Sequence, residues 1–206
     1  MDTSAIREAI ARACLQEQKA PSLHRFFSER LDELEQRLVL PPVEPIEALV
    51  DFAGQYIDAV PDFLEQIAAQ DRPAETLGYL NMAADFFIAP PGLVEDDHGL
   101  KALLDEAFLA QRLLEELNDL ALRRHSRPLL CRDMTRANII VHHLLGDQLA
   151  SRLECLVAQC LELLAREERF AAFSEDEGIG RGHWDEAPCM SRGANIDLRL
   201  RNQLSS

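Results

Sequence analysis

The sequence contains no long run of uncharged residues. Its longest stretch without Asp, Glu, Lys or Arg covers ten residues, 137–146, whereas a helix that spans a bilayer needs about 20 apolar residues. The N-terminus is charged and has no apolar segment of the kind that secretory signals carry. We therefore expect no membrane span and a cytoplasmic location.

Cysteine occurs five times, but without a pattern that builds a metal or disulfide site. The count is odd, the spacing is wide and there is no C-x-x-C pair. Structural zinc sites need paired ligands at short spacing, and disulfide frameworks need an even set of cysteines. The sequence therefore predicts reduced thiols that are mostly small core residues, and no cofactor unless a divalent cation binds at the acidic turn described below.

Positive charge is scarce. The chain has 21 basic and 36 acidic residues, which gives a formal net charge of −15. This balance argues against a nucleic-acid or anionic-membrane binder that works through a global positive field. Most of the excess lies between residues 44 and 119, which hold 17 acidic and 3 basic residues. We expect this acidic middle third to face a basic protein partner.

Glycine and proline are also few, 9 and 10 residues, and lie between segments in which apolar residues recur with a helical period. No segment alternates strictly as a strand would. The sequence therefore predicts an all-α fold, a bundle of about seven helices. The expected helices cover residues 3–19, 22–38, 46–60, 61–70, 74–88, 100–124 and 134–173, with Ser22 as an N-cap. We expect residues 1–173 to form a single helical domain, and residues 174–206 to form a flexible or docked tail that contains Trp184.

The last expected helix carries a heptad-like apolar seam. Its members are spaced alternately four and three residues apart: Leu149, Leu153, Leu156, Cys160 and Leu163. Two interpretations remain open at this point. The seam packs inside the bundle, or it joins two copies of the chain as a homodimer.

The segment 85–108 has the pattern of a helical hairpin. Pro90 and Pro91 cannot continue a helix and Gly92 permits a positive φ, so the backbone reverses between two apolar helices. We expect the two helices to pack against each other and the carboxylates to lie on the outside.

This segment also resembles the core motif of the YkvA-like family, a small helical domain of unknown function. The resemblance covers residues 80–114. The matching positions are Pro90, Leu93, Val94, Asp96 and the Asp105-Glu106 pair. It implies a helical fold but no particular chemistry, because no activity is established for the family.

The acidic turn before the second helix of the hairpin is a candidate metal site. Glu95, Asp96, Asp97 and His98 are adjacent, and oxygen-rich groups suit Mg²⁺, Mn²⁺ or Ca²⁺. The alternative is that these carboxylates cap free N–H groups of the following helix and are otherwise solvated.

Arg136 and His142 are separated by five residues on an all-helical background. This spacing resembles the R-x4-6-H motif of HEPN-type ribonucleases, which implies a dimer in which the arginine holds a phosphate and the histidine is the general acid or base. The structural alternative is that Arg136 pairs with an acid and that His142 or His143 is a half-buried, hydrogen-bonded histidine.

A local cluster of arginines precedes this motif. Its members are candidate anion-binding residues: Arg123, Arg124, Arg127 and Arg132. Taken together, the sequence favours a non-enzymatic helical protein that acts through protein–protein contact and self-association. The ribonuclease with Arg136 and His142, and the metal-binding turn, are the alternatives. Nucleic acid is an expected partner under the ribonuclease alternative alone.

Overall fold

The computed structural model describes residues 1–69, 74–88, 99–125, 128–130, 133–166 and 198–201. Within these residues the chain is all-α, as predicted, with eight helices and one small two-stranded sheet. The helices are α1 (Ser4–Lys19), α2 (Ser22–Glu29), α3 (Leu31–Arg37), α4 (Pro45–Ala68), α5 (Ala74–Ile88), α6 (Leu100–His125), α7 (Thr135–Leu145) and α8 (Asp147–Arg166). The strands are β1 (Leu38–Val39) and β2 (Arg199–Leu200).

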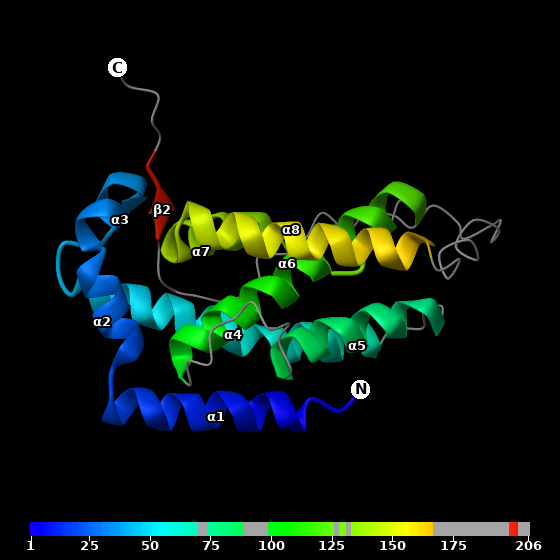
Figure 1. Cartoon of the computed structure of the whole chain (residues 1–206), viewed down its shortest axis with the longest axis horizontal. Helices are drawn as coiled ribbons and strands as arrows, with labels where there is room; N and C mark the ends of the chain where they lie inside the picture. Colours follow the sequence, from blue (N-terminus) through cyan, green and yellow to red (C-terminus); the bar gives the residue numbers. More distant parts are fainter. Residues whose placement is uncertain (70–73, 89–98, 126–127, 131–132, 167–197, 202–206) are drawn as a thin grey trace, which may run out of the picture.

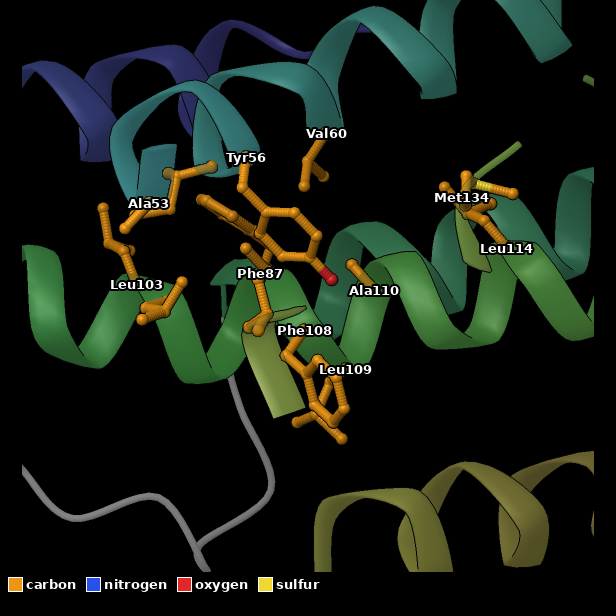
Figure 2. Packing of buried hydrophobic residues seen from close by; sticks show 14 of the residues in the cluster. Ala53, Tyr56, Val60, Phe87, Leu103, Phe108, Leu109, Ala110, Leu114 and Met134 are labelled. Carbon is orange, nitrogen blue, oxygen red and sulfur yellow. The ribbon is translucent and has the colours of Figure 1, made fainter. Parts of the chain in front are cut away.

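Helix α6 lies at the centre of the bundle. It packs against α1, α2, α4, α5, α7 and α8. Figure 1 shows α7 and α8 on one side of α6 and α1 on the other, beyond α4 and α5. Every residue of α6 from 102 to 111 is buried, so this stretch has no face turned to solvent. In Figure 2, Ala53, Tyr56 and Val60 of α4 point toward α6.

Helix α4 is continuous through Pro61, whereas the sequence predicted two helices that meet there. A proline inside a helix costs about 3 kcal/mol because it removes one hydrogen bond and crowds the preceding turn. The apolar face of α4 continues beyond it through Phe63, Leu64 and Ile67, all buried. Burying three such side chains contributes roughly 1.5–3 kcal/mol each, which outweighs the cost of the proline.

The second predicted helix, residues 22–38, is divided into α2 and α3 at Arg30. Its expected N-cap was also wrong, because Ser22 is the first residue of α2 and Pro21 is the N-cap residue. The carboxylate of Glu17 accepts hydrogen bonds from the backbone N–H groups of Ser22, Leu23 and His24 instead, at 3.1, 2.8 and 3.2 Å. A carboxylate at this position satisfies free donors and complements the positive end of the helix dipole.

The last predicted helix is likewise divided, at Gly146, into α7 and α8. Gly146 has φ +89°, a conformation that an L-residue with a side chain rarely adopts. The Arg30 guanidinium lies against this corner and donates to the backbone carbonyls of Leu144 and His143 at the end of α7. Those carbonyls have no partner within the helix, so Arg30 ties the α2–α3 junction to the α7–α8 corner.

The seam on α8 packs inside the bundle at its four described members, Leu149, Leu153, Leu156 and Cys160. Leu153 is buried, and Leu149, Leu156 and Cys160 are partly buried against the same core. Helix α8 packs on α6 and α7. The described part of the seam therefore supports the interpretation of packing within one chain.

Helices α5 and α6 pack against each other, as the hairpin prediction requires. The reversal between them, residues 89–98, lies outside the described residues. Within the described ranges, no helix combines the length and the apolar character that crossing a membrane requires.

Strand β2 brings the far end of the chain back to the N-terminal third. It pairs antiparallel with β1, with Leu38 opposite Leu200 and Val39 opposite Arg199. The backbone N–H of Arg201 donates to the carbonyl of Arg37 at 2.8 Å. Just before the strand, Leu198 is 1% exposed and belongs to the core.

Candidate functional site

Five carboxylates lie in a row on the exposed face of α4. They are Glu47, Asp51, Asp58, Asp62 and Glu65, and all are exposed. At about 100° per residue, their positions fall within an arc of roughly 60°, opposite the buried face of the helix. We call this row the acidic stripe. It is about 27 Å long, at 1.5 Å per residue.

Among the described residues, the cations in contact with the acidic stripe lie at its two ends. Arg7 of α1 contacts Asp62 and Glu65 at 2.9 and 3.0 Å, and His24 of α2 is 3.6 Å from Glu47. Hydrogen bonds from the Thr3 hydroxyl and Arg7 lower the pKa of Glu65.

The middle of the acidic stripe is less compensated. Asp51 has no ion-pair partner among the described residues. Partial burial, and then the negative charge of Asp62, raise the pKa of Asp58. A cation brought to this part of the stripe would relieve that repulsion.

Arg136 and His142 lie on different faces of α7. Arg136 is exposed and its Nη2 donates to the carbonyl of Leu198, 2.8 Å away, beside strand β2. Six residues turn a helix by about 600°, which leaves the two side chains roughly 120° apart and about 9 Å apart along the axis. The structure therefore does not bring the two residues of the R-x5-H motif together within one copy.

The surroundings of His142 are acidic. Its Nδ1 is 3.2 Å from Oε1 of Glu154, and its Nε2 is 3.5 Å from Oδ1 of Asp147. The side chain is 23% exposed, as the structural alternative expects. A carboxylate on one ring nitrogen can orient a histidine that carries a proton. These carboxylates, one near each ring nitrogen, do not favour the approach of a phosphate group.

His143 and Arg37 continue this cluster toward α3. Arg37 binds Asp147 through both Nη atoms, at 2.7 and 2.9 Å, and its Nη1 is 3.2 Å from Nδ1 of His143. Hydrogen bonding to Arg37 lowers the pKa of Asp147. Burial, and then the positive charge of Arg37, lower the pKa of His143. The cluster joins α3 to the α7–α8 corner.

A second polar chain crosses the core between α4, α6 and α7. The hydroxyl of Tyr56 donates to Oδ1 of Asn138 at 2.6 Å, and the Asn138 amide donates to Glu115. Glu115 also accepts from the Thr135 hydroxyl at 2.6 Å and from Arg112. Burial, and then the charge of Glu115, raise the pKa of Tyr56 well above its usual value. The side chains of Tyr56, Asn138, Glu115 and Thr135 satisfy one another, which is typical of a structural network.

Two adjacent carboxyl groups on α6 are buried, contrary to the expectation that the carboxylates of the hairpin lie outside. Asp105 is 7% exposed and Glu106 is 8% exposed. Burial, and then the charge of Asp105, raise the pKa of Glu106 to about 8. Because other helices surround residues 102–111 of α6, an acid at any position between them is buried.

The other predicted site residues fall mostly outside the described part of the chain. Arg123 is exposed near the end of α6, but the side chain of Arg124 and all of Arg127 and Arg132 are not described. The same holds for the predicted metal ligands, which lie at 95–98. Among the described residues there is no group of three or more His, Cys, Asp or Glu placed to hold a metal ion.

Comparison with known proteins gives no match to a family model, to a curated protein or to a solved structure. The resemblance of residues 80–114 to the YkvA-like family therefore stays a prediction.

The acidic stripe was not predicted residue by residue, although its signal is present in the sequence. Its members are separated by four, seven, four and three residues, which is the spacing of one helical face. The expected helix boundary at Pro61 concealed this, because it assigned Asp62 and Glu65 to a different helix.

Proposed function

We propose that this chain is a non-catalytic protein-binding module whose acidic stripe binds a basic segment of a partner protein. The observation that carries the proposal is the row of five exposed carboxylates on α4, with described ionic contacts limited to Arg7 and His24 at its ends. Like charges held in a row on a rigid helix repel one another. A partner with lysines or arginines at matching spacing would remove that repulsion, and its basic side chains would be attracted to the carboxylates.

The rigidity of α4 supports this proposal. The opposite face of the helix carries Phe52, Tyr56 and Leu64, which are buried in the core. The carboxylates therefore need little ordering when a partner binds, and the entropic cost of association falls.

A charge-matched pair of variants tests the proposal. The stripe variant carries Glu47→Gln, Asp51→Asn and Asp58→Asn, which leave the contacts of Arg7 intact. The control variant carries Glu29→Gln, Asp32→Asn and Glu35→Gln, which change exposed acids on α2 and α3. The probe is a synthetic lysine- and arginine-rich peptide long enough to span the stripe, titrated by calorimetry.

We expect the stripe variant to bind the peptide about tenfold more weakly than the unchanged protein. Three exposed charge pairs at roughly 0.5 kcal/mol each give this factor. The control variant should lose no more than about twofold, because its charges lie elsewhere and act at longer range. Equal losses in the two variants would show that only net charge matters, and would contradict the proposal.

Self-association is the second part of the proposal. The sequence predicted self-association and left open a homodimer through the seam on α8, but the described part of that seam packs against its own bundle. A dimer would therefore need another surface. The cytoplasmic location stays a prediction from the sequence.

A further inference from the structure

The side chain of Arg37, the last residue of α3, connects several elements at one end of the bundle. Figure 1 shows α3, β2 and α7 beside one another there. Arg37 binds Asp147, the first residue of α8, through both Nη atoms, and its backbone carbonyl accepts from the N–H of Arg201. Its Nη1 also lies 3.2 Å from Nδ1 of His143 on α7. Arg37 therefore joins α3 and the β1–β2 sheet to the α7–α8 corner.

The contact between Arg37 and His143 determines where the histidine carries its proton. A guanidinium has N–H donors only and keeps its charge, and the two hydrogens of Nη1 suffice for Asp147 and for His143. Nδ1 of His143 must therefore accept, which places the ring proton on Nε2 and leaves the ring neutral. A second proton, on Nδ1, would turn two donors and two positive charges toward each other.

The charged groups around His143 come from each element that meets it at the corner. Among the described residues they are Arg37 and Glu33 of α3, Asp147 of α8, His142 of α7 itself and Arg30 between α2 and α3. Burial, and then the positive charges of Arg37 and His142, lower the pKa of His143 below its ordinary value of 6.5. The docked ring thus binds a proton less tightly than a free ring does, so the stability that this contact gives is present above pH 6.5 and is lost as the pH falls through the lowered pKa.

We propose that His143 is a pH-sensitive latch on the β1–β2 sheet. In its neutral form the ring accepts from Arg37 and holds α3 and the sheet against the α7–α8 corner. In its protonated form the ring repels the guanidinium, the Arg37 side chain moves away, and β2 opens more often. The carbonyls at the end of α7 stay bound to Arg30, which no ring nitrogen of His143 contacts, so the corner itself persists.

Nuclear magnetic resonance on the unchanged protein tests the protonation state. Long-range ¹H–¹⁵N spectra of histidine rings distinguish the two neutral tautomers and follow protonation with pH. The signals of His143 are assigned by their loss in His143→Asn. We expect the proton on Nε2 at pH 7.5 and a pKa below 6.5. A proton on Nδ1, or a pKa at or above 6.5, would overturn the latch.

Amide hydrogen exchange at Arg201 measures how often β2 opens, because this N–H donates to the carbonyl of Arg37. Protection factors, corrected for the intrinsic effect of pH on exchange, are compared at pH 7.5 and one pH unit below the measured pKa of His143. If that pKa lies one pH unit below 6.5, we expect protection of the Arg201 amide to fall by about tenfold. The amide of Ala20, which donates to Gln16 at the end of α1, is the internal control and should stay within about twofold.

The variant His143→Asn separates the latch from the other groups that titrate in this pH range. Its side-chain oxygen can accept from Arg37 but cannot be protonated, so the protection of the Arg201 amide should change by less than about twofold. The matched control His24→Asn removes an exposed histidine of α2 and should keep the full fall. A fall of the same size in His143→Asn would contradict the latch, and so would equal protection of the unchanged protein at the two pH values.

Discussion

At the scale of single residues, burial makes Glu106 a source of pH-dependent stability. Its pKa is about 8 in the folded chain, against an ordinary value of 4.5. Between these values the folded state keeps a proton that the unfolded state has lost. The free energy of unfolding therefore falls as pH rises from 4.5 to 8, by up to about 1.4 kcal/mol per pH unit.

We expect Glu106→Gln to remove this part of the pH dependence. The variant should match the unchanged protein near pH 4.5 and become progressively more stable than it toward pH 8. Urea unfolding at pH 5, 6.5 and 8 measures the difference. Glu35→Gln, a change at an exposed acid of α3, is the control. A constant difference between Glu106→Gln and the unchanged protein at all three pH values would contradict the raised pKa.

The chain of hydrogen bonds through Asn138 makes a second prediction. Asn138 is 3% exposed and joins the Tyr56 hydroxyl to Glu115. Asn138→Leu leaves both groups buried with one partner fewer, so we expect a loss of about 2–4 kcal/mol in the free energy of unfolding. Tyr56→Phe removes only the hydroxyl and should cost about 1 kcal/mol. The double variant Tyr56→Phe/Asn138→Leu tests the coupling. If it lowers the free energy of unfolding by the full sum of the two single losses, the hydrogen bond does not couple these side chains.

The ribonuclease alternative can also be tested at this scale. Because Arg136 and His142 lie on different faces of α7 and His142 lies among carboxylates, we expect no RNA cleavage that depends on them. The test incubates labelled single-stranded RNA with the unchanged protein, His142→Ala and Arg136→Ala. Cleavage that is lost in both variants would restore the ribonuclease hypothesis.

At the scale of elements, the corner between α7 and α8 depends on Gly146. An added Cβ there would lie 2.9 Å from Nη2 of Arg30, and the backbone has φ +89°. We expect Gly146→Ala to lower the free energy of unfolding by about 1–3 kcal/mol, because both the backbone and the arginine must shift. Thermal and urea unfolding measure the loss.

Gly54 provides the matched control for this prediction. It lies inside α4, and a Cβ there would meet nothing within 4 Å. Gly54→Ala should therefore stabilise the chain by up to about 1 kcal/mol, since alanine loses less conformational freedom in a helix. If Gly146→Ala and Gly54→Ala change the free energy of unfolding equally, a side chain at position 146 does not strain the α7–α8 corner.

Much of this helical architecture could be predicted from apolar periodicity. The bounds of α5 agree with the prediction, and those of α1 and α6 agree to within one residue. The errors occurred where a local signal competes with distant packing. Pro61 signals a boundary, but the apolar face of α4 continues past it. Gly146 marks the real break, which involves Arg30, a residue more than a hundred positions away.

The site was predicted less well than the fold, and for a related reason. Periodicity places an acid such as Glu106 on the surface, because a helix usually has a solvated face. That inference fails when a helix is covered on all sides, and the number of neighbours of α6 cannot be read from its own residues. The acidic stripe could have been predicted from the sequence if α4 had been predicted at its full length.

At the scale of the whole molecule, the net charge of −15 predicts that salt stabilises the fold. Repulsion among exposed carboxylates acts over distances that salt screens, with a Debye length of about 10 Å at 0.1 M. We expect the melting temperature to rise between about 10 and 300 mM NaCl, by roughly 2–4 °C for each kcal/mol gained. A fall in the melting temperature would mean that attraction in surface ion pairs such as Arg7 with Glu65 affects stability more than the repulsion among carboxylates does.

Because α6 lies at the centre of the bundle, the order of synthesis limits which contacts the growing chain can make. A ribosome releases a chain from its N-terminus, so α1, α2, α4 and α5 are synthesised before the helix against which all four pack. Until residues 100–125 have emerged, the apolar faces of these four helices can contact only one another. The nascent chain therefore passes through a stage in which apolar surface is exposed. At this stage a chaperone would find the largest apolar surface to bind.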